Sequence, residues 1–131
     1  MNKKILLVTA LFITFSTLLS SEICGQTNLN GNNQFIYKLK LIPSLLDENN
    51  WTERENNIVK IHFERLKELT EKGTVIIAGR TINSDESQFG IVIFEAANIK
   101  EAEIFMNEDP AVKEKIMSAE LFPFRVALMR N

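Results

Sequence analysis

The sequence predicts an α+β fold of the ferredoxin-like type, with the element order β-α-β-β-α-β. Two short runs rich in β-branched residues lie close together in the chain, separated by one polar turn, which is typical of paired strands. A helix-like segment lies on the outer side of each run, and a further strand-like run lies at either end. Two right-handed crossovers then place both helices on one face of a four-stranded antiparallel sheet.

The first half of the domain is predicted to hold one strand and one long helix. Residues 35–41 form the strand, because apolar and polar side chains alternate along its second half. Thr52 and Glu55 have the spacing of a capping box, and Gly73 supplies the stop, so a helix is predicted from Thr52 to about residue 72. The apolar positions with helical spacing are Ile58, Ile61, Leu66 and Leu69.

The second half is predicted to hold three strands and a second helix. In chain order these are a strand at residues 74–78, a polar turn at 83–88, a strand at 89–94, a helix that begins with a capping-box pattern at 98–101, a helical turn at 111–115 and a strand at 121–129. Gly79 is predicted to close the first of these strands. The second helix presents Ile99, Ala102, Phe105 and Met106 on one face, and Phe94, Phe122 and Phe124 are predicted core residues.

The N-terminus has the pattern of a secretory signal peptide. Lys3 and Lys4 precede an apolar stretch that reaches about residue 19, and small polar residues follow. We predict a signal peptide at residues 1–25, a flexible Asn- and Gly-rich leader at 26–34 and the domain at 35–131. The apolar stretch is shorter than the roughly 20 residues that span a bilayer, so an exported protein, periplasmic or extracellular, without a stable membrane span is expected.

Two alternatives to cleavage after Gly25 are open. The apolar stretch can be a buried helix or a retained anchor. Cys24 can carry a lipid anchor, although Glu22 and Ile23 before it are poor matches to that type of processing. Cys24 is the only cysteine in the chain, so no disulfide is expected in the domain.

Charge and motif content exclude several function classes. The net charge is −2 and basic residues are interspersed with acidic ones, so no nucleic-acid footprint is expected. A single histidine and no clustered carboxylates argue against a metal site. The chain also has no glycine-rich phosphate loop, nucleophile elbow or nucleotide fingerprint, so no cofactor is predicted.

The two middle strands predict a homodimer. They are apolar at successive positions, and therefore on both faces of the sheet, whereas a strand with one wet face alternates. Two helices cover only one face. A large apolar face on a free monomer is unusual, so we expect a second copy to pack sheet against sheet in a dimeric α+β barrel.

An ordered set of short motifs carries a family resemblance. It consists of His62-Phe63 in the first helix, Ala78-Gly79 after the second strand, Asp109-Pro110 after the second helix and Pro123-Phe124 in the last strand. The chain resembles the YCII-related domain family over residues 35–130 or so. The resemblance implies a dimeric ferredoxin-like barrel without a cofactor, and a His-Asp pair as the proposed active site. His62 and Asp109 fall on those two positions.

The family resemblance leaves the reaction open. Most family members have no assigned reaction, one branch is similar to dehydrochlorinases of chlorinated hydroxyquinols, and relatives by fold include muconolactone isomerase. The predicted export signal departs from the typical cytoplasmic member, which puts a metabolic role in doubt. The polar insert at residues 47–51 gives no support for a dehydrochlorinase substrate.

The residues alone allow two interpretations for the role of His62 and two for the role of Asp109. His62 shares a helix stripe with Ile58 and Leu66, so it faces the sheet, either as a hydrogen-bonded core residue or as a proton-transfer group. Asp109 before Pro110 is a favoured N-cap, and it can also hold a His62 ring nitrogen. One carboxylate oxygen can cap while the other meets the histidine.

Three further positions are weaker candidates. Arg80 at a strand end can hold an anionic substrate group or form a surface salt bridge. Lys38 and Lys40 lie on the opposite side of the first strand from its apolar residues, where they line an anion-binding cleft or protect the surface. Trp51 before the capping threonine is either a hydrophobic staple or a pocket lid, and we favour the staple.

Three functions are therefore open at this point. The first is a cofactor-free lyase or isomerase in which His62, assisted by Asp109, moves a proton on a small molecule. The second is a binding protein that uses the same pocket without turnover. The third is a structural or partner-binding dimer in which His62 is only hydrogen-bonded. Fold analogy does not choose between them, because this architecture hosts unrelated functions.

Overall fold

The computed structural model describes residues 33–130 of the chain. Its elements in chain order are β1 (Asn33–Leu41), the 3-10 turns η1 (Pro43–Leu45) and η2 (Glu48–Asn50), α1 (Glu53–Glu71), β2 (Val75–Arg80), β3 (Gly90–Ala96), α2 (Ile99–Asn107), α3 (Pro110–Lys113) and β4 (Met117–Phe124). Both 3-10 turns lie between β1 and α1, with only η2 inside the polar insert at residues 47–51, and neither was predicted.

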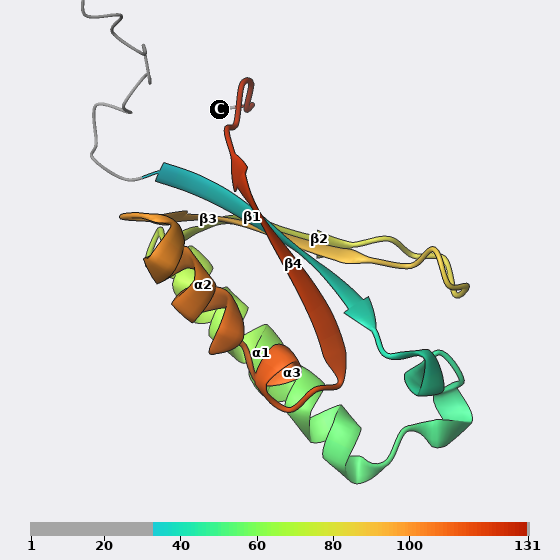
Figure 1. Ribbon diagram of the computed structural model, residues 1–131. Coiled ribbons are helices and arrows are strands. Elements are labelled where there is room, and N and C mark those ends of the chain that lie inside the picture. Colours follow the sequence, from blue (N-terminus) through green and yellow to red (C-terminus); the bar gives the residue numbers. More distant parts are fainter. Residues whose placement is uncertain (1–32, 131) are drawn as a thin grey trace, which may run out of the picture.

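The strands form one antiparallel sheet, and the α-helices lie along one of its faces (Figure 1). The strand order is β2-β3-β1-β4, so β1 and β3 are central and β2 and β4 are edges. This arrangement confirms the predicted ferredoxin-like α+β fold. The face away from the helices is called the open face below.

Helix α1 begins and ends as the sequence predicts. The Thr52 side chain accepts from the amide of Arg54, and Glu55 reaches back to the Thr52 amide, which completes the capping box. Gly73 follows the helix with a φ of 81°, a conformation that favours glycine. The prediction was wrong for Ile61, which is 49% exposed, because it lies off the line of Ile58, Leu66 and Leu69.

The second helix also differs from the prediction at one apolar position. The Asn98 side chain caps α2 by accepting from the Glu101 amide, as the pattern of residues 98–101 predicted. Ala102 is fully buried, and Phe105 packs against the core. Ile99 is 47% exposed, because this first helical residue lies outside the buried stripe.

Strand β2 is longer than predicted and contains a register shift. Val75 pairs with Phe94, whereas Ile77 pairs with Ile93, so Ile76 is an extra residue in the strand. Gly79 does not close the strand, which continues to Arg80 and pairs there with β3. The extra residue shifts the alternation by one position, so side chains after it lie on the opposite face from the one that simple alternation predicts.

Strand β4 begins and ends earlier than the predicted residues 121–129. Its pairing with β1 runs from Met117 opposite Leu41 to Phe124 opposite Gln34. Within the described residues, β1 extends only one residue beyond the Gln34–Phe124 pair, so no pairing continues for β4 after Phe124. The apolar alternation that continues to residue 128 therefore misplaced the end of the strand.

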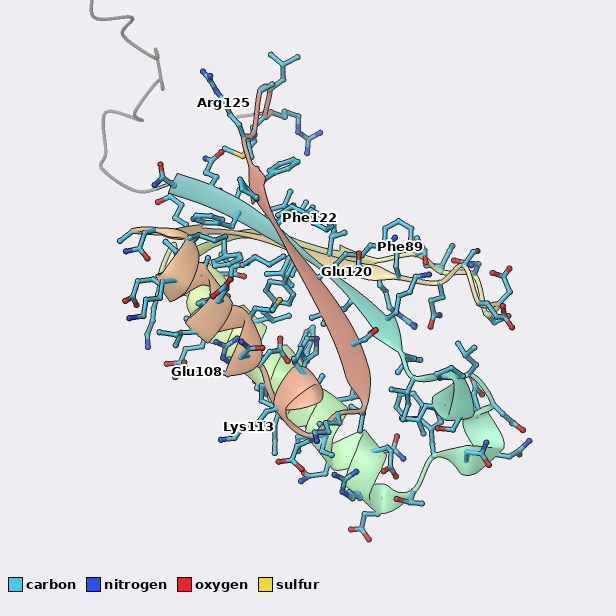
Figure 2. The ribbon with its side chains drawn as sticks, viewed as in Figure 1. Phe89, Glu108, Lys113, Glu120, Phe122 and Arg125 are labelled. Carbon is cyan, nitrogen blue, oxygen red and sulfur yellow. The ribbon has the colours of Figure 1, made fainter. Side chains whose placement is uncertain are left out.

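The phenylalanines of β4 are not core residues in the described chain. Phe122 is 48% exposed and Phe124 is 38% exposed, whereas Phe94 is fully buried as predicted. The register places Phe122 beside Ile36 on the open face, on the side away from the helices (Figure 2). The predicted alternation of β1 is confirmed, since Phe35, Tyr37 and Leu39 are buried on the helix side.

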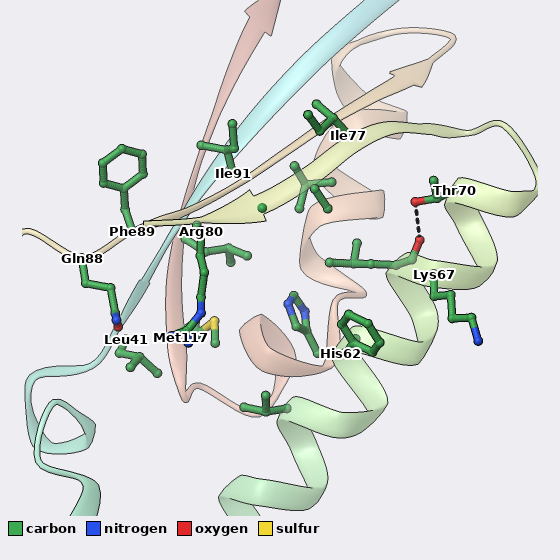
Figure 3. A pocket seen from close by; sticks show the side chains of 18 of the residues that line it. Leu41, His62, Lys67, Thr70, Ile77, Arg80, Gln88, Phe89, Ile91 and Met117 are labelled. Carbon is green, nitrogen blue, oxygen red and sulfur yellow. Dashed lines mark hydrogen bonds between the residues drawn. The ribbon is translucent and has the colours of Figure 1, made fainter. Parts of the chain in front are cut away.

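The open face is largely apolar. The strand register places six apolar side chains on it: Ile36, Ile77, Ile91, Ile93, Phe122 and Phe124. Phe89, just before β3, lies on the same face (Figure 3). Lys38 and Lys40 lie on the same face, and the Lys38 amine lies 4.9 Å from the centre of the Phe89 ring.

The predicted signal peptide, including Cys24, and most of the leader lie outside the described residues. Asn33 and Gln34 were predicted to belong to the leader, but both pair with β3 at the start of β1. None of the helices in residues 33–130 is long and apolar enough to cross a membrane.

Candidate functional site

His62 and Asp109 meet between α1 and the start of α3. The Nδ1 atom of His62 lies 2.6 Å from Oδ1 of Asp109. Asp109 is fully buried, and the His62 side chain is 13% exposed. An ionised carboxylate only accepts hydrogen bonds, so a neutral His62 donates from Nδ1 and leaves Nε2 as an acceptor.

Asp109 serves as a helix cap at the same time. Its Oδ1 atom accepts from the backbone amide of Ala111 at 3.0 Å, which confirms the predicted N-cap of α3. The capping oxygen is the same one that meets His62, whereas the sequence suggested one oxygen for each role. The second oxygen, Oδ2, accepts instead from the hydroxyl of Tyr37 at 2.7 Å.

The surroundings of Asp109 favour its ionised form. Burial by itself raises the pKa of the Asp109 carboxyl, but the hydrogen bond and charge of His62 lower it, and bonds from Tyr37 and the Ala111 amide add to this. The net effect holds the pKa of Asp109 below its usual value. Burial, followed by the charge of Asp109, raises the pKa of the Tyr37 hydroxyl, so this group stays a donor.

Two residues of this site were missed by the sequence analysis. Tyr37 lies on the helix side of β1, where its ring contacts Phe94 and Phe105 edge-on. Arg65 donates to the backbone oxygen of Phe105 at 2.9 Å and places Nη1 4.0 Å from Oδ2 of Asp109. Arg65 lies one helical turn after His62, and Tyr37 is the chain's only tyrosine, so spacing and rarity were the available signals.

A cavity of about 900 Å³ opens beside His62 (Figure 3). It lies between α1 and the end of the sheet formed by β2 and β3. Its wall is mostly apolar and includes Leu39, Leu66 and Met117. Such a concave, apolar site with few polar groups is typical of small-molecule binding.

Comparison with known proteins assigns the family. The model of the YCII-related domain matches residues 41–125. The chain belongs to the YCII-related domain family. No curated protein matches the chain.

A solved structure shares the fold of this YCII-related domain. It is 5-chloro-2-hydroxyhydroquinone dehydrochlorinase from Burkholderia phenoliruptrix in complex with 2,5-dihydroxybenzoquinone, which is 18% identical with a TM-score of 0.53. The match covers 70% of this chain and 93% of the dehydrochlorinase chain. At this identity the likeness supports the fold of the YCII-related domain.

The other candidate residues of the YCII-related domain lie on both faces of the sheet. Arg80 lines the same cavity as His62, and Figure 3 shows its side chain on the helix side of β2. Lys38 and Lys40 lie on the open face and do not line this cavity, although the Lys38 amine contacts Phe89, which does. Trp51 packs with the cluster around Leu45 and Ile58, as a staple would, and also lines the cavity.

The described part of the YCII-related domain offers no cluster for a metal ion. Within residues 33–130 no three His, Cys, Asp or Glu side chains gather in a way that could hold one. The polar groups at the cavity are therefore the His62 ring with its Asp109 partner, and a few side chains that include Arg80 and Gln88.

Proposed function

We propose that this protein is a cofactor-free enzyme of the lyase or isomerase type, in which His62 moves a proton on a small molecule. The observation that carries the proposal is the buried Asp109 carboxylate, 2.6 Å from Nδ1 of a histidine whose ring lines a cavity. The two ring nitrogens then have separate roles, because Nδ1 is hydrogen-bonded to Asp109 and Nε2 is left for a ligand.

The proton balance of such a reaction needs only these two side chains. Nε2 of His62 accepts a proton from a substrate carbon, and the resulting imidazolium is stabilised by Asp109. In an elimination, the electron pair of the broken C–H bond forms a double bond as a leaving group departs with its own pair. In an isomerisation, His62 returns the proton to a different carbon.

Tyr37 and Arg65 support this role from behind the carboxylate. The Tyr37 hydroxyl fixes Oδ2 of Asp109, and the packing of its ring against Phe94 and Phe105 holds the hydroxyl in place. Arg65 lies over the Phe105 ring, with its guanidinium carbon 4.6 Å from the ring centre. These contacts keep the carboxylate oriented, which is what a general base needs from its partner.

The NMR signal of the Nδ1 proton of His62 tests the pair directly. His62 is the only histidine, so its ring signals need no assignment against others. A hydrogen bond to a charged carboxylate is shorter and stronger than one to a neutral group, so we expect this proton to resonate further downfield in the wild-type protein than in Asp109→Asn. Identical signals in both proteins would reduce Asp109 to a helix cap and remove the basis for catalysis.

Turnover is tested with His62→Gln, because glutamine keeps hydrogen bonds but cannot cycle a proton. Proton transfer is followed as deuterium uptake from heavy water into hydroquinones and cyclic ketones, together with chloride release from 5-chloro-2-hydroxyhydroquinone. A general base contributes about 10²–10⁴-fold, so the variant should lose at least that factor while it remains folded. Equal rates in both proteins would contradict the proposal.

One observation favours a second candidate, a binding protein without turnover. Two of the three hydrogen bonds of Asp109 have a structural purpose, since it caps α3 and satisfies the buried Tyr37 hydroxyl. Under this alternative the cavity binds its ligand equally well in His62→Gln, and no proton exchange occurs in the wild-type protein. The same two measurements therefore separate the candidates.

We also propose that two copies pair through the open face and that the domain is exported. The pairing is supported by apolar side chains on that face, among them Ile77 and Phe122, which are 53% and 48% exposed. Export is supported by the basic and apolar pattern of residues 1–25. A structural dimer without a ligand remains the outcome if the cavity binds nothing.

A further inference from the structure

The wall of the cavity on the sheet side carries a cation. Ala78 and Gly90 lie on the helix side of β2 and β3, and their small size leaves room there. A methyl group added at Gly90 would lie 3.6 Å from Leu39 Cβ, so a side chain there would occupy part of the cavity. Arg80 is the residue paired with Gly90, and its side chain points into this space (Figure 3).

The bulge in β2 is the reason that Arg80 faces the cavity. Val75 is buried on the helix side, and strict alternation would continue through residues 77 and 79, placing Arg80 on the open face. The extra residue Ile76 reverses the alternation from Ile77 onward. Bulges of this kind commonly redirect a side chain beside a functional site.

The charge of Arg80 is not neutralised within the described chain. None of the ion pairs in residues 33–130 involves Arg80. The other charged side chains that line the cavity are Lys67 and Glu71, which cancel each other. The cavity is therefore an apolar space with an excess of one positive charge, provided by Arg80.

We infer that the ligand of this cavity is a small, mostly apolar acid in its anionic form, bound with its acidic group on Arg80. A guanidinium binds an anion that has two oxygens through two parallel hydrogen bonds. Arg80 is itself exposed, so a ligand whose apolar body enters the cavity can reach its guanidinium. The apolar body of the ligand then lies against Leu39, Leu66 and Met117. A carboxylate and a sulfonate each present two oxygens to the guanidinium, whereas a phenolate presents one.

The inference also suggests where negative charge accumulates during the proposed proton transfer. This consequence, unlike the anion site itself, rests on the proposed function. When Nε2 of His62 removes a proton from a carbon conjugated to an oxygen, the electron pair of the C–H bond delocalises onto that oxygen. An oxygen held by Arg80 keeps this negative charge beside a cation. Arg80 and His62 would then act on opposite ends of one conjugated ligand.

Binding of a matched pair of fluorescent probes to the purified protein tests the inference. The probes are 8-anilino-1-naphthalenesulfonate and N-phenyl-1-naphthylamine, which share a ring system but only the first carries an anion. The variants are Arg80→Gln, Arg80→Lys and the control Lys38→Gln, which removes a cation from the open face. Circular dichroism confirms that each variant is folded.

We expect Arg80→Gln to weaken binding of the sulfonate about tenfold and to leave the neutral probe within about twofold. Arg80→Lys should retain most of the sulfonate affinity, and Lys38→Gln should not change it. Equal weakening of both probes, no change in either, or the same loss in Lys38→Gln would overturn the inference.

The two proposals fail separately. His62→Gln should keep sulfonate binding, because His62 does not hold the anion. If Arg80→Gln does not change probe binding while His62→Gln abolishes proton exchange, the proposed anion site is wrong and the proposed enzyme function is supported. If Arg80→Gln selectively weakens the sulfonate while no proton exchange occurs, the cavity binds anions without turnover.

Discussion

The substitution Asp109→Asn measures how much the buried carboxylate contributes to the fold. The carboxylate accepts three hydrogen bonds, from Tyr37, His62 and the amide of Ala111. Asparagine has nearly the same shape, but one of its two terminal groups is a donor. We expect its oxygen to keep the bonds from His62 and Ala111, and its NH₂ group to face Tyr37, whose hydroxyl must then accept.

The expected cost follows from the loss of charge at three bonds. A hydrogen bond to a charged group contributes about 1.5–3 kcal/mol, and a neutral one about 0.5–1.5 kcal/mol. A loss of about 1 kcal/mol at each bond lowers the free energy of unfolding by about 3 kcal/mol. That is a large part of the roughly 5–15 kcal/mol that stabilises a typical domain.

Urea unfolding at pH 7 and pH 3 measures this cost and its pH dependence. The pKa of Asp109 in the folded protein lies below its usual value, so the stabilisation by the carboxylate is present above the unfolded pKa of about 4. It is lost as the pH falls through the lower folded pKa. Asparagine does not titrate, so the stability difference between the two proteins should shrink toward low pH.

The control for this experiment is Glu108→Gln, which removes an exposed carboxylate next in the chain. Its effect on the free energy of unfolding should stay within about 0.5 kcal/mol. A difference of less than about 0.5 kcal/mol between wild type and Asp109→Asn at pH 7 would refute the reasoning. So would a difference of the expected size that does not change with pH.

The remaining predictions concern the open face, the start of α1 and the N-terminus. Phe122→Glu should convert the proposed dimer to a monomer in analytical ultracentrifugation, whereas Ile104→Glu on α2, with 43% exposure, should not. Unchanged sedimentation of the first variant would argue against the proposed pairing. Thr52→Ala should lower the free energy of unfolding by about 1 kcal/mol through loss of the helix cap. In that variant the pKa of Glu55, held at about 2 chiefly by the Thr52 side chain, should rise in a carbon NMR titration; no rise would contradict the capping box. Mass spectrometry of the protein secreted by a bacterial host should give an N-terminus at Gln26, and an intact Met1 would exclude processing.

Much of the candidate site was open to prediction because local periodicity determines which side of a helix a residue occupies. His62 falls on the stripe of Ile58 and Leu66, and the structure places it against the sheet side as that spacing requires. Asp109 before a proline predicts an N-cap, and the structure shows one. Tyr37 and Arg65 were missed, because they lie on β1 and α1, far in the chain from Asp109 at the start of α3, and only the tertiary structure brings the three together.

The sequence by itself determined the element order, the capped starts of α1 and α2, and the apolar character of both sheet faces. These depend on side-chain patterns within a few residues, which physical rules relate directly to helices and strands. Only the tertiary structure decided where β4 ends, which follows from its pairing with β1. It also decided that Arg80 faces the cavity, because one extra residue in β2 reverses the alternation and no local pattern reports such a shift.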